Sequence, residues 1–244
     1  MDRFRVSAVT HPGFARDHNE DAYVSRPELG LWAVADGAGG HQSGEAASGL
    51  IIDALDAIPP ELALEELLGQ VRFHMAAAHA VLREQAARRG DGALVASTVV
   101  LLIIRDGYFA CLWAGDSRAY LLRDGALSQI TRDHSLVQEL VDTGHITESE
   151  AEGHPRANII TRAVGAEPDI LELEKVTGRL ASGDRFMLCS DGLSKELADL
   201  EIADILRAEG ATLAAHTLLE AALARQAGDN VTVVVVEALE DQSV

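Results

Sequence analysis

Hydrophobic and polar positions along the chain follow the periods of both strands and helices. Short runs that are almost wholly apolar, or that alternate with polar residues, predict strands. These runs lie at residues 4–9, 22–25, 31–35, 95–104, 108–113, 118–122, 126–130, 170–176, 185–189 and 231–236. Apolar residues spaced three and four apart predict helices, and these segments lie at residues 43–58, 61–89, 133–143 and within 197–227. The chain thus opens with strands, continues with two helices and a second run of strands, and ends in a mixed half.

The second run of strands has turn signals that are typical of hairpins. Asp106-Gly107 and Asp124-Gly125 separate consecutive strands, and Asp-Gly readily takes the positive φ angles of a tight turn. Consecutive antiparallel strands argue against a parallel sheet of βαβ units. Neither a linker nor an internal repeat interrupts the sequence. We therefore expect one α+β domain over residues 1–238, with layered antiparallel sheets and helices outside, followed by a short tail at 239–244.

Composition places the chain among ordinary globular proteins, because 48% of its 244 residues are hydrophobic and 24% are charged. The 20 Lys and Arg residues face 39 Asp and Glu residues, a formal charge of −19. This charge argues against nucleic acid or an anionic membrane as the partner. The longest apolar run, 95–104, is far shorter than the roughly 20 residues that cross a bilayer, and the N-terminus lacks the apolar core of a signal peptide. We expect a cytoplasmic protein without membrane association.

Cysteine and zinc chemistry are not indicated by the sequence. Cys111 and Cys189 each lie inside an apolar run, which predicts buried free thiols rather than a disulfide. No cluster of Cys and His has the spacing of a zinc site.

Carboxylates lie where several apolar strands end or begin. The acidic residues in these positions are Asp36, Asp116, Asp191 and Asp229. An ionised carboxylate at the edge of a core is costly to desolvate unless a cation offsets it, and the chain has only two lysines. Oxygen ligands of this kind suit hard divalent cations such as Mg²⁺ or Mn²⁺. The pattern therefore predicts a metal site if these strand ends meet in the fold.

The segment after Asp36 has two other interpretations. Asp-Gly after a strand is often only a turn, but here the glycine-rich segment 38–44 and a helix follow instead of another strand. Gly37-x-Gly39 between a strand and a helix also resembles part of a dinucleotide-binding fingerprint. That fingerprint fails because Gln42 stands in place of its third glycine.

Six motifs, in a fixed order, carry a resemblance to a known family. They are Gly13-x-x-Arg16-x-x-Asn19-Glu20-Asp21, Val34-Ala35-Asp36-Gly37, Gly115-Asp116-Ser117-Arg118, Thr131-x-Asp133-His134-Ser135, Ser190-Asp191-Gly192 and Gly228-Asp229-Asn230. Each motif alone is weak, whereas the whole series in this order is specific. From about residue 6 to 236 the chain resembles the metal-dependent Ser/Thr protein phosphatases, the protein phosphatase 2C family, and its stand-alone bacterial members in particular.

The resemblance implies a four-layer α-β-β-α sandwich of two antiparallel sheets flanked by helices. It implies hydrolysis of phosphoserine and phosphothreonine in proteins by a metal-bridging hydroxide, with two Mn²⁺ or Mg²⁺ ions as cofactors. The partners it implies are phosphorylated proteins and a cognate bacterial Ser/Thr kinase, and we expect a monomer. An inactive relative that only binds phosphoproteins is the alternative, but such a protein should have lost acidic residues that this chain retains.

The resemblance also assigns metal ligands. Asp36 would bridge the two ions. Glu20 and the Gly37 carbonyl would complete one of the two sites. Asp191 and Asp229 would hold the other ion.

Further roles follow from the same motifs. Asp21 would lie outside the ligand shell and hydrogen-bond metal-bound water, so that Arg16, Asp21 and Asp36 form the catalytic set. The planar guanidinium of Arg16 would grip the substrate phosphate. Asp116 and Asp191 match the positions that hold a third, weaker ion in bacterial members.

The chain departs from the family at two positions, and one segment has two interpretations. Many eukaryotic members have His where this chain has Ala38, so the proton donor is unassigned, with His41 or a metal-bound water as candidates. Lys195 stands where members commonly have a carboxylate, which leaves the third ion open. The segment 136–166 resembles the family's flap, in which Arg162 would bind substrate, or it is an ordinary surface excursion.

Overall fold

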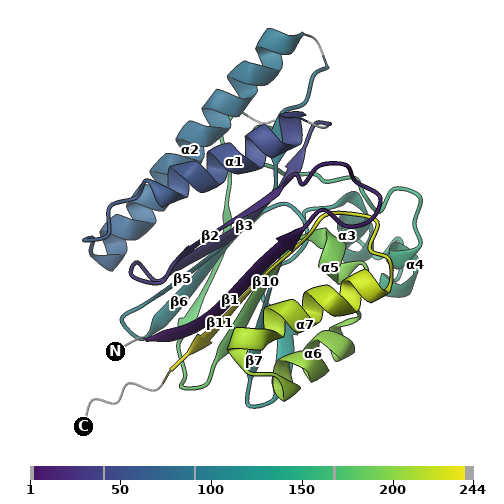
Figure 1. Ribbon diagram of the computed structural model, residues 1–244. Helices are drawn as coiled ribbons and strands as arrows, with labels where there is room; N and C mark the ends of the chain where they lie inside the picture. Colours follow the sequence, from purple (N-terminus) through teal and green to yellow (C-terminus); the bar gives the residue numbers. More distant parts are fainter. Residues whose placement is uncertain (1–2, 41, 91, 167–168, 240–244) are drawn as a thin grey trace.

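Two antiparallel sheets, stacked face to face, form the centre of the protein. The computed structural model describes residues 3–40, 42–90, 92–166 and 169–239 (Figure 1). Helices α1 (Gln42–Asp56) and α2 (Leu64–Arg89) cover the outer face of one sheet. Helices α5 (Asp191–Ser194), α6 (Asp199–Ala208) and α7 (Ala211–Ala224) lie on the other sheet. The predicted α+β sandwich with four layers is confirmed.

Both sheets are antiparallel throughout their main paths. The first has the order β1-β11-β10-β7-β8, with β1 (Phe4–His11), β11 (Val231–Ala238), β10 (Arg185–Cys189), β7 (Arg118–Arg123) and β8 (Ala126–Gln129). The second has the order β2-β3-β5-β6-β9, with β2 (Asp21–Arg26), β3 (Leu31–Ala38), β5 (Val99–Arg105), β6 (Tyr108–Ala114) and β9 (Glu174–Arg179). The short strand β4 (Ala96–Ser97) pairs with β3 outside this path. The predicted hairpin turns are present, with positive φ of 52° at Asp106 and 51° at Asp124.

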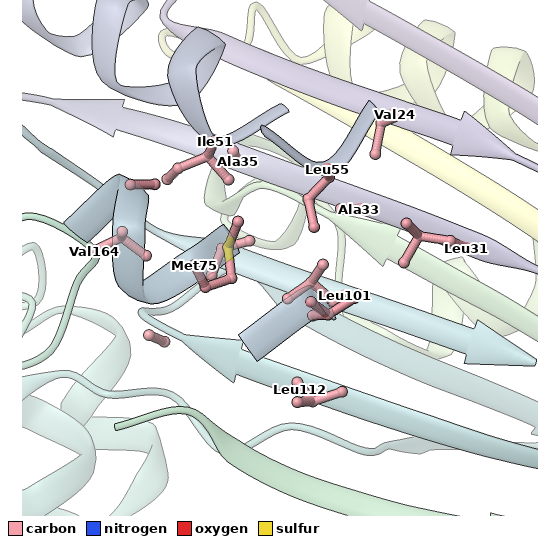
Figure 2. Packing of buried hydrophobic residues seen from close by; sticks show 14 of the residues in the cluster. Val24, Leu31, Ala33, Ala35, Ile51, Leu55, Met75, Leu101, Leu112 and Val164 are labelled. Atoms are coloured by element: carbon pink, nitrogen blue, oxygen red, sulfur yellow. The ribbon is translucent and has the colours of Figure 1, made fainter. Parts of the chain in front are cut away.

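Three apolar clusters correspond to the three interfaces between the four layers. Figure 2 shows the cluster under α1 and α2, where Ile51, Leu55 and Met75 lie over Leu101 and Leu112 of the second sheet. The cluster between the sheets includes Trp32, Phe186 and Val234, and the cluster under α6 and α7 includes Ile202, Leu218 and Val233. Each large side chain that is buried in this way contributes about 1.5–3 kcal/mol relative to exposure. The clusters therefore fix how the two sheets stack.

The strand register places the strand ends that carry the predicted site acids beside the ends of neighbouring strands. In the second sheet, the first residue of β2 lies opposite the end of β3, with Asp21 paired to Asp36. In the first sheet, the end of β1 lies opposite the start of β11, with His11 paired to Val231. The end of β10 lies beside the start of β11 as well. In each sheet, ends and starts of neighbouring strands therefore lie together at one end of the sheet.

The segment 136–166 forms two short helices beside that end (Figure 1). Helix α3 (Leu136–Asp142) is capped by Ser135, and α4 (Glu148–Glu152) begins with the predicted capping box at Thr147. Isolated bridges Ser135 to Ile160 and Ser97 to Val164 attach the two ends of the segment to the domain.

Several predicted boundaries differ from the structure. The strand expected at 170–176 is wrong in position: β9 begins at Glu174 because it pairs with β6, and Leu171 and Leu173 instead pack against the helix-covered core. The run 95–104 divides at Thr98, whose backbone N donates to the Asp36 carbonyl at 2.8 Å. The last strand extends to Ala238. Apart from Leu239, the predicted tail lies outside the described residues, so the domain limits stay a prediction.

The two cysteines are buried free thiols, as predicted. Burial raises the pKa of both thiols, that of Cys189 to about 12. No helix within the described residues is long and apolar enough to cross a membrane.

Candidate functional site

Acidic residues from both sheets meet at the shared end of the sandwich. Asp21 and Asp36 lie opposite each other on β2 and β3 of the second sheet. Asp191 is the first residue of α5, directly after β10 of the first sheet, and Asp229 immediately precedes β11. The strand ends that the sequence predicted to meet are therefore brought together.

Two hydrogen bonds join the sheets at this point. The Ser190 hydroxyl donates to Asp21 Oδ2 at 2.7 Å, and the Glu20 backbone N donates to Asn230 Oδ1 at 2.8 Å. The Asn230 amide also donates to the Pro12 carbonyl at 2.9 Å, which holds the loop that carries Arg16. Ser190 and Asn230 thus position acidic residues across the interface between the sheets.

A close approach of backbone surrounds Glu20. A side-chain carbon added at Gly37 would lie 2.1 Å from the Gly44 carbonyl oxygen. One added at Gly44 would lie 2.8 Å from the Glu20 carboxyl carbon and 2.9 Å from the Gly37 carbonyl oxygen. Only glycine fits at both positions, because a Cβ on Gly37 would overlap the Gly44 backbone and a Cβ on Gly44 would crowd the Glu20 carboxylate and the Gly37 carbonyl.

Burial and neighbouring charges raise the pKa values of three carboxyl groups in the site. Burial, followed by the charges of Asp21 and Asp191, raises the pKa of Asp36 well above its usual range. Burial, opposed by hydrogen bonds from Ser190 and Thr232, raises the pKa of Asp21 to about 7. Burial and the Asp191 charge raise the pKa of Asp116 to about 7. A cluster of this kind gains free energy from cations that offset its charge.

Buried carboxylate oxygens in the cluster without a hydrogen-bond partner among the described residues include Asp21 Oδ1, Asp116 Oδ1 and Asp191 Oδ1. A buried acceptor without a partner is costly, and a divalent ion is the natural partner for an oxygen-only donor set of this charge. The residues present therefore fit Mn²⁺ or Mg²⁺ and not a soft metal.

Basic side chains already neutralise two of the acids. Lys195 Nζ bonds to Asp191 Oδ2, and Arg16 Nε lies 2.9 Å from Asp229 Oδ1. Among the described residues, no three or more Asp, Glu, His or Cys side chains are drawn around one point in the arrangement of a metal cage. The site acids thus lie close together, and two of them, Asp191 and Asp229, are paired with basic side chains of the protein itself.

Thr98 is a positioning residue that sequence reasoning missed. Its Oγ1 accepts from the Asp36 backbone N at 3.2 Å and lies 2.7 Å from Ser117 Oγ. Ser117 follows Asp116, so one hydroxyl connects the loops of two site acids. The sequence feature that marks Thr98 is its place, next to Ser97, as a polar residue inside the otherwise apolar run 95–104.

Arg162 forms an ion pair with an acid of β9. Its Nη1 is 3.5 Å from Glu174 Oε1, and it lines a cavity of about 570 Å³ with Arg72, Leu171 and Glu172. Its predicted contact with substrate stays a prediction. His41 lies outside the described residues, so its candidacy as a proton donor also stays a prediction.

Comparison with known proteins identifies this arrangement. The sequence matches the family Protein phosphatase 2C over residues 15–226. It is 37% identical over 239 residues to the serine/threonine protein phosphatase PstP of Mycobacterium tuberculosis, an alignment that covers 97% of this chain and 45% of PstP. The chain thus spans less than half the length of that relative. Because the family match covers most of the sequence, the chain belongs to the protein phosphatase 2C family.

Solved structures agree with the family and the fold. PppA of Pseudomonas aeruginosa, a key regulatory component of T6SS, is 43% identical with a TM-score of 0.88, covering 97% of this chain and 98% of PppA. The catalytic domain of PstP in complex with two manganese ions is 35% identical with a TM-score of 0.86, covering 97% of this chain and 99% of that domain.

Proposed function

We propose that the protein is a metal-dependent serine/threonine protein phosphatase that removes phosphate from phosphoserine and phosphothreonine in proteins. The single observation that carries this proposal is the convergence of acids from both sheets on one site, with Arg16 at its edge. Family membership and the manganese ions of the PstP domain support it.

The metal ligands we propose divide into two groups. Glu20, the Gly37 carbonyl and Asp36 would hold one Mn²⁺ or Mg²⁺ ion, with Asp36 shared. Asp191 and Asp229 would hold the other. Ions bound there would supply Lewis acidity, which makes water nucleophilic at neutral pH and offsets the charge of the phosphoryl group.

Arg16 and Asp21 would act on the reacting groups themselves. The Arg16 side chain is about half exposed, at 51%, so its guanidinium is accessible to a substrate phosphate and could bind two of its oxygens. Asp21 Oδ2 accepts a hydrogen bond from the Ser190 hydroxyl, which restrains the carboxyl group. We propose that Asp21 Oδ1 accepts a hydrogen bond from the attacking water and orients it. Ala38 has no group that can protonate the leaving alkoxide, and we assign that step to no residue.

The biological setting is a further part of the proposal. The substrates would be phosphoproteins, and the natural opponent would be a bacterial Ser/Thr kinase. We also propose that the protein works as a monomer in the cytoplasm, and that Arg162 assists in binding substrate. The formal charge of −19 supports a protein partner rather than nucleic acid.

The test is phosphate release from a phosphothreonine peptide by the metal-free protein, with and without added Mn²⁺ or Mg²⁺. We expect turnover to require the divalent ion and to stop when EDTA is added. Asp36→Asn should be inactive with metal, whereas Asp204→Asn, which changes an exposed acid on α6, should behave as the wild type. Turnover undiminished by EDTA would refute the proposal, and binding of the phosphopeptide without hydrolysis would favour the inactive relative instead.

A further inference from the structure

Lys195, whose side chain is 40% exposed, places a positive charge beside Asp191 at the edge of the acidic cluster. It follows the last residue of α5 and lies four residues after Asp191, so that its side chain lies over the first turn of the helix. Its Nζ bonds to Asp191 Oδ2, and its backbone N donates to the Asp191 carbonyl at 2.9 Å. The side-chain bond joins the ammonium to the Asp191 carboxylate, and the backbone bond holds the two residues on the same helical turn.

The ammonium interacts with more than one site acid. Burial lowers the pKa of Lys195, but the charges of Asp191, Asp116 and Asp229 outweigh this effect and raise it overall. The Lys195 charge in turn lowers the pKa of Asp116, against the larger effects that raise it. The charge of Lys195 therefore acts on Asp116 as well as on Asp191, its bonded partner.

The two oxygens of Asp191 have different environments. Oδ2 is bonded to Lys195, whereas Oδ1 is buried and has no hydrogen-bond partner among the described residues. A carboxylate that serves two metal ions normally gives one oxygen to each. Asp191 thus has one oxygen available for an ion and one that is already committed to an internal cation.

We propose that Lys195 limits this site to two divalent ions, because its ammonium takes the Asp191 oxygen that a third ion between Asp116 and Asp191 would need. This inference rests on the proposed function, since it concerns the same metal site. The ammonium supplies one positive charge in place of that ion's two, and it repels any cation that approaches Asp116. Asp116 would then act on the site through its charge and not as a metal ligand.

The experiment counts Mn²⁺ bound to the protein, independently of activity. Metal-free wild type, Lys195→Met and Lys195→Arg are titrated with Mn²⁺ in a calorimeter, and the free ion is measured in parallel by electron paramagnetic resonance. We expect two bound ions for the wild type and for Lys195→Arg. We expect a third ion for Lys195→Met, with affinity at least about tenfold tighter than any third binding to the wild type.

Two controls separate the effect of Lys195 from general charge and folding. Lys175→Met removes the only other lysine of the chain, an exposed residue of β9, and should leave the count at two. Asp116→Asn in the Lys195→Met background should return the count from three to two. Thermal melting of each variant shows that it is folded.

The outcomes distinguish this inference from the proposed function. Three ions in the wild type, or two in a folded Lys195→Met variant, would overturn the inference while leaving a two-metal phosphatase intact. A wild type that binds no Mn²⁺ would overturn both. Two ions in the wild type and three in Lys195→Met support the inference even if a chosen phosphopeptide is a poor substrate.

Discussion

The Arg16 guanidinium faces the Asp229 carboxylate side by side, with Nε 2.9 Å from Oδ1 and Nη2 donating to Oδ2 at 3.0 Å. This hydrogen bond, followed by the charge of Asp229, raises the pKa of Arg16. A phosphate group offers the same pair of oxygens to a guanidinium. In the role proposed for Arg16, a substrate phosphate would therefore compete with Asp229 for the same two donors.

Replacing Arg16 by alanine tests this role. We expect Arg16→Ala to raise KM for a phosphopeptide by about tenfold or more and to lower kcat less, because a charge-assisted pair of hydrogen bonds to the bound phosphate is lost. Steady-state kinetics with saturating Mn²⁺ measure both constants. Arg88→Ala, which removes an exposed arginine paired with Glu84 on α2, is the matched control. An unchanged KM would count against phosphate binding by Arg16.

Replacing Asp191 by asparagine tests the second metal position. Mutation of a group that only supports a metal ligand lowers metal affinity or activity about 10–100-fold. Loss of a ligand oxygen in Asp191→Asn should therefore lower turnover at least about 100-fold. Circular dichroism should show an unchanged fold, because the side chain keeps its shape. Near-wild-type turnover at low Mn²⁺ would show that Asp191 is not a ligand.

Thr98 offers a test of positioning rather than of metal binding. Thr98→Val keeps the shape of this buried side chain but removes the acceptor for the Asp36 backbone N. We expect up to about a tenfold fall in kcat, together with weaker Mn²⁺ binding, since one buried hydrogen bond contributes about 0.5–1.5 kcal/mol. Thr98→Ser should restore both quantities. If valine and serine variants lose the same activity, the loss comes from packing and not from the hydroxyl.

The pH dependence of stability follows from the raised pKa of Asp21. Its pKa is about 7 in the folded protein against a usual value of 3.8, so the folded state favours the protonated carboxyl. Its contribution to stability is complete below about pH 4 and is lost as the pH rises through about 7. We therefore expect the Tm of the chelated wild type to fall between pH 5 and pH 8 more steeply than that of Asp21→Asn.

Added Mn²⁺ should reverse most of that fall, because bound cations offset the carboxylate charge. Asp204→Asn serves as the control, since Asp204 is exposed and pairs with Arg207 on the same helix. Equal slopes for the wild type and Asp21→Asn would mean that the Asp21 carboxyl does not titrate in this range.

The sequence was most informative where one residue carries a strong local signal. Asp36 and Asp191 each end an apolar run, and Asp-Gly turns at 106 and 124 set the antiparallel pairing, so the layers and the acidic strand ends could be predicted. The position of β9 could not, because Leu171 and Leu173 look like strand residues but pack under helices. That choice depends on the length of β6, a partner far away in sequence.

Side-chain pairing within the site was also beyond the sequence. The contact between Lys195 and Asp191 depends on α5 starting at Asp191, and the bond from Thr98 to Asp36 depends on the strand break at Thr98. The ion pair of Arg162 with Glu174 could not be predicted either, and its expected contact with substrate stays a prediction. Local sequence patterns show where polar residues lie, whereas the tertiary fold determines which side chains form hydrogen bonds and ion pairs with them.

The bond from Ser190 to Asp21 has a consequence for folding order. Ser190 follows a strand of one sheet and Asp21 begins a strand of the other, and they are 169 residues apart in the chain. Neither half of the sequence can assemble the acidic cluster alone, so fragments that fold as isolated sheets would be inert. During refolding, manganese affinity should therefore appear only once the two sheets have docked, and its appearance would report that docking.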